Sequence, residues 1–156
     1  MPKVGDFFES YRANEFTLSV DGTESPGVTK ISGLSEGEID TIEQPDGGSN
    51  HVYKVAATKI KFEPLTVERY VDGSPEDARF KAWFAATFNM GTKTNGGSSV
   101  RKNGMINKYH NGAVVLRFSF HNAWVKSSKF TDLEAGSANL MKQTIVIEHE
   151  GLQRED

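Results

Sequence analysis

The chain has 156 residues, of which 37% are hydrophobic and 25% are charged, and its formal net charge is −3. This composition is that of an ordinary globular protein, which excludes the disordered, collagenous and membrane classes. It also argues against a general nucleic-acid binder, because affinity for phosphate backbones depends on clustered lysine and arginine. The length fits one compact domain over residues 1–156, and the 15 glycines and 10 phenylalanines favour short strands joined by turns.

The first predicted elements are two strands. Residues 15–20 alternate apolar and polar side chains and lead into an Asp-Gly turn. Residues 28–34 show a second strand pattern, in which Gly33 predicts a bulge or a close approach between two backbones.

An acidic strand is predicted next, over residues 36–43. Its acidic side chains Glu36, Glu38 and Asp40 fall on one parity, so we expect one face of this strand to be wet. Residues 44–50 then give a strong loop signal. A further strand pattern follows, and its apolar parity flips after Pro64, which suggests a bulge or an edge.

One helix is predicted. It begins at Ser74, which with Pro75 at the first helical position and Asp77 forms an N-terminal capping arrangement. An apolar stripe follows at i, i+3, i+4 and i+8, and we expect it to pack on a sheet. Its members are Phe80, Trp83, Phe84 and Phe88.

The last third of the chain opens on a polar stretch. Residues 91–112 are rich in Gly, Asn, Ser and Lys and are predicted to form a long loop, part of which a partner would order. Strand patterns return at 114–125 and 140–152. The order of strands, helix and strands indicates a mainly β protein with a single helix. We interpret Trp83, Phe84, Phe88 and Phe118 as core, and Trp124 as core or a subunit contact.

Residues needed for catalysis or metal binding show no recognisable pattern. Cysteine is absent, which excludes disulfides, zinc–thiolate sites and cysteine nucleophiles. The four histidines are far apart in the sequence and none has a metal-ligand spacing. A complete phosphate-binding loop is also missing. We therefore expect no enzyme, no cofactor and no metal.

The sequence contains no candidate membrane anchor. No stretch approaches the roughly 20 apolar residues that a membrane span needs, and the first residues lack the apolar segment of a secretory signal. We expect the chain to be made and assembled in the cytoplasm without inserting into a membrane.

Several segments, taken in order, resemble the tail-tube family shared by contractile phage tails, extracellular contractile injection systems and, more distantly, the type VI secretion tube. They include a short helix that contains Trp83. The others are FTLSVDG (16–22), ISGLS (31–35), LTVER (65–69), FSFHNAW (118–124), LEAGSAN (133–139) and TIVIEHEGL (144–152). The family pattern usually has proline after the tryptophan of Asn-Ala-Trp, whereas Val125 stands here and changes a local turn.

The resemblance implies a small antiparallel β-barrel or sandwich with one flanking helix, assembling as hexameric rings that stack into a hollow tube. Contraction of a surrounding sheath would drive this tube through a target envelope, and the bore would conduct an effector protein or DNA. The implied partners are further copies of the chain, the sheath protein, baseplate and spike proteins, a terminator cap and the luminal cargo. The particle would be a phage tail or a cell-encoded injection system.

Within this hypothesis, Glu36, Glu38 and Asp40 line the lumen or face a neighbouring subunit. An N-terminal arm (residues 1–13) and the loops 44–50 and 91–112 are candidates for contacts with the next ring or the sheath. The residues that represent these three segments are Phe7, Phe8, Asp46, Gly47, Gly48 and Lys102.

Two alternatives stay open. One is a monomeric β-barrel that binds a small apolar ligand, which would need a cavity that alternating patterns cannot reveal. The other is a hydrolase that uses a carboxylate pair such as Glu36 with Glu38 or Glu148 with Glu150, although solvated strand faces explain such pairs more simply.

Overall fold

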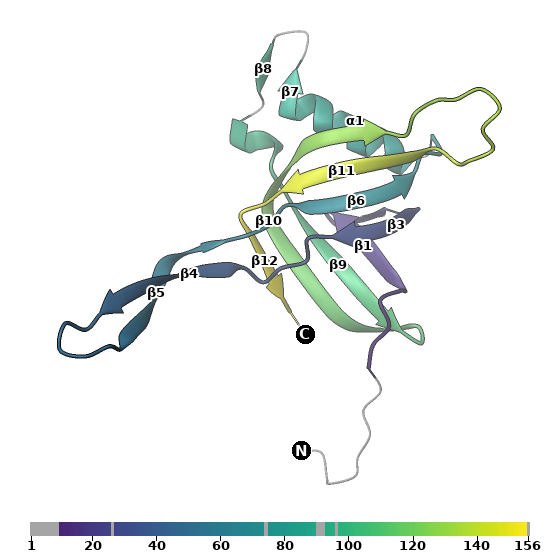
Figure 1. Ribbon diagram of the computed structural model, residues 1–156. Helices are drawn as coiled ribbons and strands as arrows, with labels where there is room; N and C mark the ends of the chain where they lie inside the picture. The colour runs from purple at the N-terminus through teal and green to yellow at the C-terminus, as the bar shows by residue number, and fades with distance from the viewer. Residues whose placement is uncertain (1–9, 26, 74, 90–92, 96, 156) are drawn as a thin grey trace.

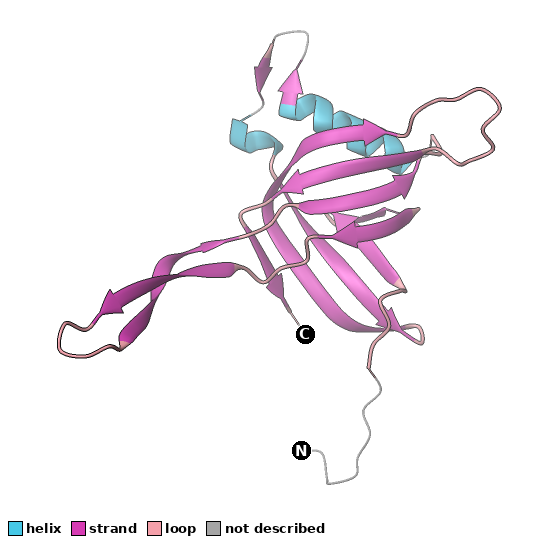
Figure 2. Cartoon of the chain, viewed as in Figure 1, coloured by secondary structure: helices cyan, strands magenta, loops and turns pink. Residues whose placement is uncertain are grey.

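The fold is described here from a computed structural model, which covers residues 10–25, 27–73, 75–89, 93–95 and 97–155. Antiparallel strands form most of it, and one α-helix flanks them (Figure 2). The mainly β architecture with a single helix is thereby confirmed. The principal sheet has eight strands in the order β2-β1-β9-β10-β11-β6-β3, and β12 pairs with β10 beside this path. Its strands are β1 (Phe16–Val20), β2 (Thr23–Ser25), β3 (Val28–Ser32), β6 (Leu65–Tyr70), β9 (Lys102–His110), β10 (Ala113–Phe130), β11 (Lys142–Glu148) and β12 (Gly151–Arg154).

The long strand β10 joins the two halves of this sheet. Its first part pairs with β9 and β12, and its second part pairs with β11. Register shifts at Phe120/Ala123 and Val125/Ser127 interrupt the pairing near the middle of the strand, where bulges increase bending and twist. The two halves therefore turn toward each other around β10 and enclose the core (Figure 1). We call this eight-stranded unit the barrel.

The core draws side chains from both halves of the sheet and from the helix. Alternation along β6 and β11 buries every second residue, which places Leu65, Val67, Ile145 and Ile147 inside. The full set of buried apolar residues is Leu18, Leu65, Val67, Phe80, Trp83, Ile106, Phe120, Ala123, Val125, Ile145, Ile147 and Leu152.

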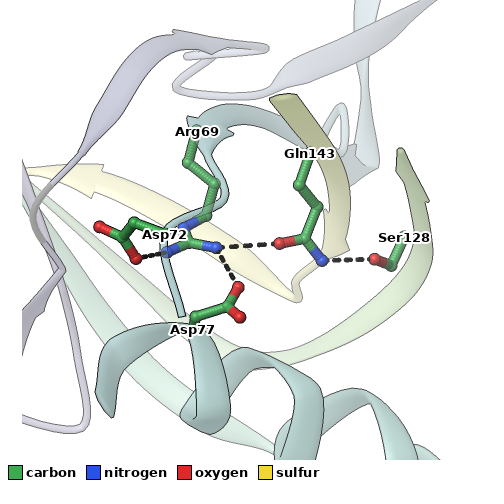
Figure 3. Close-up of polar contacts among 5 residues, drawn as sticks. All are labelled: Arg69, Asp72, Asp77, Ser128 and Gln143. Atoms are coloured by element: carbon green, nitrogen blue, oxygen red, sulfur yellow. Dashed lines mark hydrogen bonds and ion pairs between the residues drawn. The ribbon is translucent and has the colours of Figure 1, made fainter. Parts of the chain in front are cut away.

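A network of polar side chains occupies inward-facing positions near the end of β6 and the start of β11. The Arg69 guanidinium is fully buried, and its Nη1 donates to Asp77 Oδ1 at 2.6 Å and to Gln143 Oε1 at 3.0 Å (Figure 3). Gln143 in turn donates to Ser128 Oγ at 2.6 Å, while Asp72 Oδ1 lies 3.8 Å from the second terminal nitrogen of Arg69. One side chain thus connects β6, β10, β11 and the start of the helix.

The helix α1 (Pro75–Thr87) contacts the sheet along a narrow line. Phe80 and Trp83 are both 4% exposed, the Trp83 indole donates to the Val100 carbonyl at 2.7 Å, and the Arg69 guanidinium lies over the Phe80 ring. The prediction that Phe84 and Phe88 belong to the core is wrong, because they are 40% and 45% exposed. Of the four residues in the predicted stripe, only Phe80 and Trp83 are buried against the sheet.

The ends of the helix differ in part from the prediction. Pro75 is its first residue, as predicted, whereas the expected cap Ser74 lies outside the described residues. Phe88 has already left the helix and begins β7 (Phe88–Asn89), which pairs with β8 (Thr94–Asn95). Among the other predicted core aromatics, Phe118 is half-buried against the core cluster and Trp124 is half-buried.

The predicted long polar loop over residues 91–112 is wrong for most of its length. A short 3-10 helix (Gly97–Val100) precedes β9, and β9 pairs with β1 on one side and β10 on the other. Only Ile106 of this strand is fully buried, so hydrogen bonds to two neighbours rather than its own apolar pattern place it in the sheet. Gly104 lies against the Phe120 ring, where a Cβ atom would come within 2.1 Å of a ring carbon.

A two-stranded hairpin, β4 (Glu38–Pro45) with β5 (Val52–Lys61), stands apart from the barrel and projects far beyond it (Figure 1). Gly33 and Pro64 form the neck where the chain enters and leaves this hairpin. A Cβ atom on Gly33 would lie 2.2 Å from the Pro64 carbonyl oxygen, so the predicted close backbone approach is confirmed. The parity flip at Pro64 marks the change from the hairpin to the barrel.

The Arg69 network predicts a large stability loss for Arg69→Met. The substitution keeps much of the side-chain volume but removes the donors to Asp77 and Gln143, so we expect the free energy of unfolding to fall by about 3 kcal/mol. Urea denaturation measures this change. Arg79→Met, at an exposed position of α1, is the matched control and should change stability by less than about 0.5 kcal/mol. Equal midpoints for the two variants would contradict the role given to Arg69.

Candidate functional site: an unsupported hairpin

The β4–β5 hairpin exposes apolar side chains that the described part of its own subunit does not cover. Every residue of β4 is exposed, and neither strand packs extensively on any other described helix or strand. Six apolar residues of the hairpin are between 43% and 55% exposed, namely Ile39, Ile42, Val52, Tyr53, Val55 and Ile60. A hairpin without such support is marginally stable in water.

Apolar side chains occupy both faces of this hairpin. Directly opposite residues of an antiparallel pair share a face, and Ile42 opposes Val55 while Ile39 opposes Ile60. Ile39 and Ile42 differ by an odd number of positions, so the two pairs lie on opposite faces. The acidic face of this strand is exposed, as expected, but the opposite face is exposed as well, and both faces carry apolar groups.

The polar residues of the hairpin stabilise its shape. Asp40 pairs with Lys61 at 3.0 Å, and this hydrogen bond raises the pKa of the Lys61 ammonium. At the tip, Asp46 accepts hydrogen bonds from the Gly48 amide and the Ser49 hydroxyl, each at 3.0 Å, which lower the pKa of its carboxyl. Asp46 thus closes the turn, as Asp side chains commonly do.

The base of the hairpin rests on a buried histidine. Phe62 follows β5, and its ring centroid lies 5.7 Å from that of His149, which is 9% exposed. Just before β4, a Cβ atom at Gly37 would come within 2.4 Å of the Ile60 side chain, so this side chain packs closely on the Gly37 backbone. The packing of Phe62 on His149 therefore connects the hairpin to the barrel.

The structure places the predicted site residues in three groups. Glu36, Glu38 and Asp40 are exposed on the stem of the hairpin and on the segment leading into it. Gly47 and Gly48 lie at its tip together with Asp46. Phe7 and Phe8 lie outside the described residues, as does most of the predicted arm.

Lys102 is part of the subunit's own packing. It begins β9, its ammonium lies 3.7 Å from Asp21 Oδ2, and it stands over the Trp83 ring. Its prediction as a residue of a long contact loop is wrong, because the segment around it is a sheet strand.

The carboxylate pairs do not form an acid–base site. Glu148 pairs with Lys126 at 3.3 Å, and Glu150 accepts hydrogen bonds from Asn122 and Arg101. The Asn122 hydrogen bond, together with the charge of Arg101, lowers the pKa of Glu150, so this carboxyl remains ionised and is a poor proton donor. Among the described residues, no group of three or more His, Asp and Glu could hold a metal ion.

The described part of the chain has no helix that is both long and apolar enough to cross a membrane.

The sequence does indicate that the hairpin is apolar on both faces, although the pattern of its acidic residues does not reveal it. Ile39 and Ile42 lie on opposite parities of one strand, and Val52, Tyr53 and Val55 do so on the next. Apolar residues on both parities of a short strand indicate a segment covered on both sides. The helices and strands that the structure describes supply no such cover.

Comparison with solved structures shows that chains from several contractile particles and an Hcp protein share this fold. The cap of the anti-feeding prophage matches with a TM-score of 0.79 and 19% identity over 96% of this chain and 93% of the other. The sheath–tube complex of the PVC extracellular contractile injection system matches at 0.73 and 18% identity over 94% and 91%. Hcp1 from Flavobacterium johnsoniae matches at 0.56 and 17% identity over 91% and 95%.

The sequence itself gives the family. Residues 12–153 match the model of the T4-like virus tail tube protein gp19, and the chain belongs to this family. It is a structural tube protein and not an enzyme. No curated protein sequence matches the chain.

The buried His149 predicts a pH-dependent stability. Burial lowers its pKa from the usual 6.5, although the Glu63 and Gly151 backbones and the Glu148 carboxylate act in the opposite direction. The unfolded chain therefore binds more protons than the folded one as the pH falls through 6.5, and the free energy of unfolding decreases. Urea denaturation at pH 7.5 and at about pH 5.5 measures this decrease. His149→Gln should show a smaller decrease, and an identical one would contradict the prediction.

Proposed function

We propose that this chain is the inner-tube subunit of a contractile phage tail or injection particle, with six copies in each ring and rings stacked into a hollow tube. The observation that carries the proposal is the hairpin with apolar side chains on both faces, which the described part of the subunit leaves uncovered. Membership in the tail-tube family supplies the architecture in which further copies of the same chain provide that cover.

The function is mechanical. A surrounding sheath contracts, and the tube moves through the target envelope with its cargo, an effector protein or DNA, in the bore. The stem carboxylates Glu36, Glu38 and Asp40 face this lumen or a neighbouring subunit. Where they face the lumen, their negative charge keeps DNA or an acidic effector from adhering to the wall.

The partners follow from the same architecture. They are other copies of the chain, a sheath protein, baseplate and spike proteins and a terminator cap. Similar folds occur in a sheath–tube complex, a baseplate and a tube-terminating cap, which supports these partner classes. The chain is assembled in the cytoplasm and then becomes part of the particle.

Electron microscopy of the purified protein tests the proposal. We expect rings with a central hole and, at high concentration, stacked rings or tubes. The control is the same protein in about 4 M urea, where most small domains are unfolded and no rings should form. A strictly monomeric species at high concentration, with no particle in which it assembles, would contradict the proposal.

The hairpin predicts an assembly defect that leaves folding intact. Ile42→Asp places a charge on an apolar stem face and should raise the protein concentration needed for assembly by tenfold or more, which corresponds to about 1.4 kcal/mol per contact. The thermal midpoint of the monomer should stay close to wild type, because Ile42 is 55% exposed and outside the core.

Sedimentation velocity and negative-stain microscopy give the two readouts for this variant. Ile42→Val retains an apolar side chain and is the matched control, so it should assemble like the wild type. Normal assembly of Ile42→Asp would contradict a contact on this face.

A further inference from the structure

His149 lies at the corner between β11 and β12, where the hairpin joins the barrel (Figure 1). Its ring packs against two phenylalanines. The ring centroid lies 5.7 Å from that of Phe62, which follows β5, and 6.4 Å from that of Phe120 in β10. His149 is 9% exposed, and Phe62 also packs against the apolar core. One histidine thus connects the base of the hairpin to a corner of the barrel and to its core.

The surroundings of this ring suit a neutral imidazole. Neither ring nitrogen has a hydrogen-bond partner among the described residues, and burial between aromatic rings penalises the charged form. The backbones of Glu63 and Gly151 and the Glu148 carboxylate favour the charged form, but burial is the larger effect and lowers the pKa of His149 from its usual 6.5. A proton on this ring therefore destabilises the packed arrangement.

The other titratable groups near the ring are in different surroundings. Those on the segments that pack on His149 are Glu63, His121, Glu148 and Glu150. Glu148 is paired with Lys126, and Glu150 is paired with Arg101. Glu63 and His121 are exposed, so water already solvates them when the ring is covered. The buried group whose protonation depends on the packing at this corner is His149.

The base of the hairpin can open while the barrel stays folded. β4 and β5 pack on each other and not extensively on any other described helix or strand. Release of Phe62 would bring His149 into water, whereas Leu65 and Ile147 would remain buried in the core. A region with few packing contacts opens locally at a lower free energy than global unfolding requires.

We propose that His149 is a pH-sensitive latch, whose neutral ring holds Phe62 and the hairpin base against the barrel and whose protonation releases them while the barrel stays folded. The released state exposes the ring and binds a proton near its usual pKa of 6.5, whereas the latched state binds one only at lower pH. Release is therefore favoured as the pH falls through 6.5, by up to about tenfold between about pH 7.5 and about pH 5.5. The latch belongs to the single subunit and goes beyond the proposed function.

Hydrogen exchange of the unassembled chain tests the latch. The backbone amides of residues 60–63, at the base of the hairpin, report local opening, and those of residues 143–147 in β11 report unfolding of the barrel. After correction for the pH dependence of intrinsic exchange, we expect residues 60–63 to lose up to about tenfold more protection than β11 between about pH 7.5 and about pH 5.5. Equal changes in the two segments would overturn the latch.

Two histidine substitutions assign the local response to His149. His149→Phe keeps an aromatic ring beside Phe62 and Phe120 but cannot bind a proton, so the extra loss of protection at the hairpin base should disappear. His121→Gln removes an exposed histidine from β10, is the matched control and should respond like the wild type. His149→Gln gives the same comparison if the phenylalanine perturbs folding. A local response that persists without the His149 imidazole would overturn the inference.

The outcomes separate this inference from the proposed function, because the exchange experiment needs no assembled particle. Wild-type tubes from a chain whose hairpin base shows no local opening at about pH 5.5 would overturn the latch and leave the tube assignment intact. A chain that never forms rings, yet shows the local opening and loses it in His149→Phe, would overturn the proposed function and support the latch.

Discussion

The buried Arg69 guanidinium is the interaction on which the rest of the subunit depends. It stands on the inward parity of β6, where alternation would otherwise place another apolar residue, and it joins three strands to the first turn of α1 (Figure 3). Its Nε has no hydrogen-bond partner among the described residues, so the burial of this cation is not fully compensated. The network therefore specifies where the helix lies on the sheet, while the apolar core supplies most of the stability.

The subunit divides into a part that is stable by itself and a part that is not. The barrel encloses residues such as Phe120, Leu18 and Ile147, which have no exposed surface. The hairpin has cross-strand pairs and the Asp40–Lys61 ion pair but no core, and an exposed ion pair contributes little. Most of the free energy that would order the hairpin is thus released only when another molecule covers it. In a polymer of one small subunit, this arrangement links the final shape of the chain to its assembly.

The neck of the hairpin, formed by Gly33 and Pro64, connects these two parts. Gly33 allows the backbone to pass against Pro64, and Phe62 rests on the buried ring of His149. These contacts fix the direction in which the hairpin leaves the barrel, so the proposed contact with another subunit depends on them. Small changes at the neck should therefore affect the geometry of a contact far from it.

Local pattern was sufficient to predict much of the fold. Period-two alternation located β1, β3, β6 and β11, Pro75 located the start of the helix, and the ordered motifs predicted the tail-tube family, which the family match confirms. These features could be predicted because backbone geometry and the neighbouring residues along the chain decide them.

Only the tertiary structure determines which of these residues are paired or buried, and by which segments of the chain. Lys102–His110 has the composition of a loop, yet it is a strand because β1 and β10 hydrogen bond to both of its edges. Phe84 continues an apolar stripe but faces solvent, because the sheet reaches only Phe80 and Trp83. In each case the deciding contact comes from a segment distant in the sequence. Ile39 and Ile42 are apolar in the sequence yet exposed in the structure, because no described segment of the subunit packs on them.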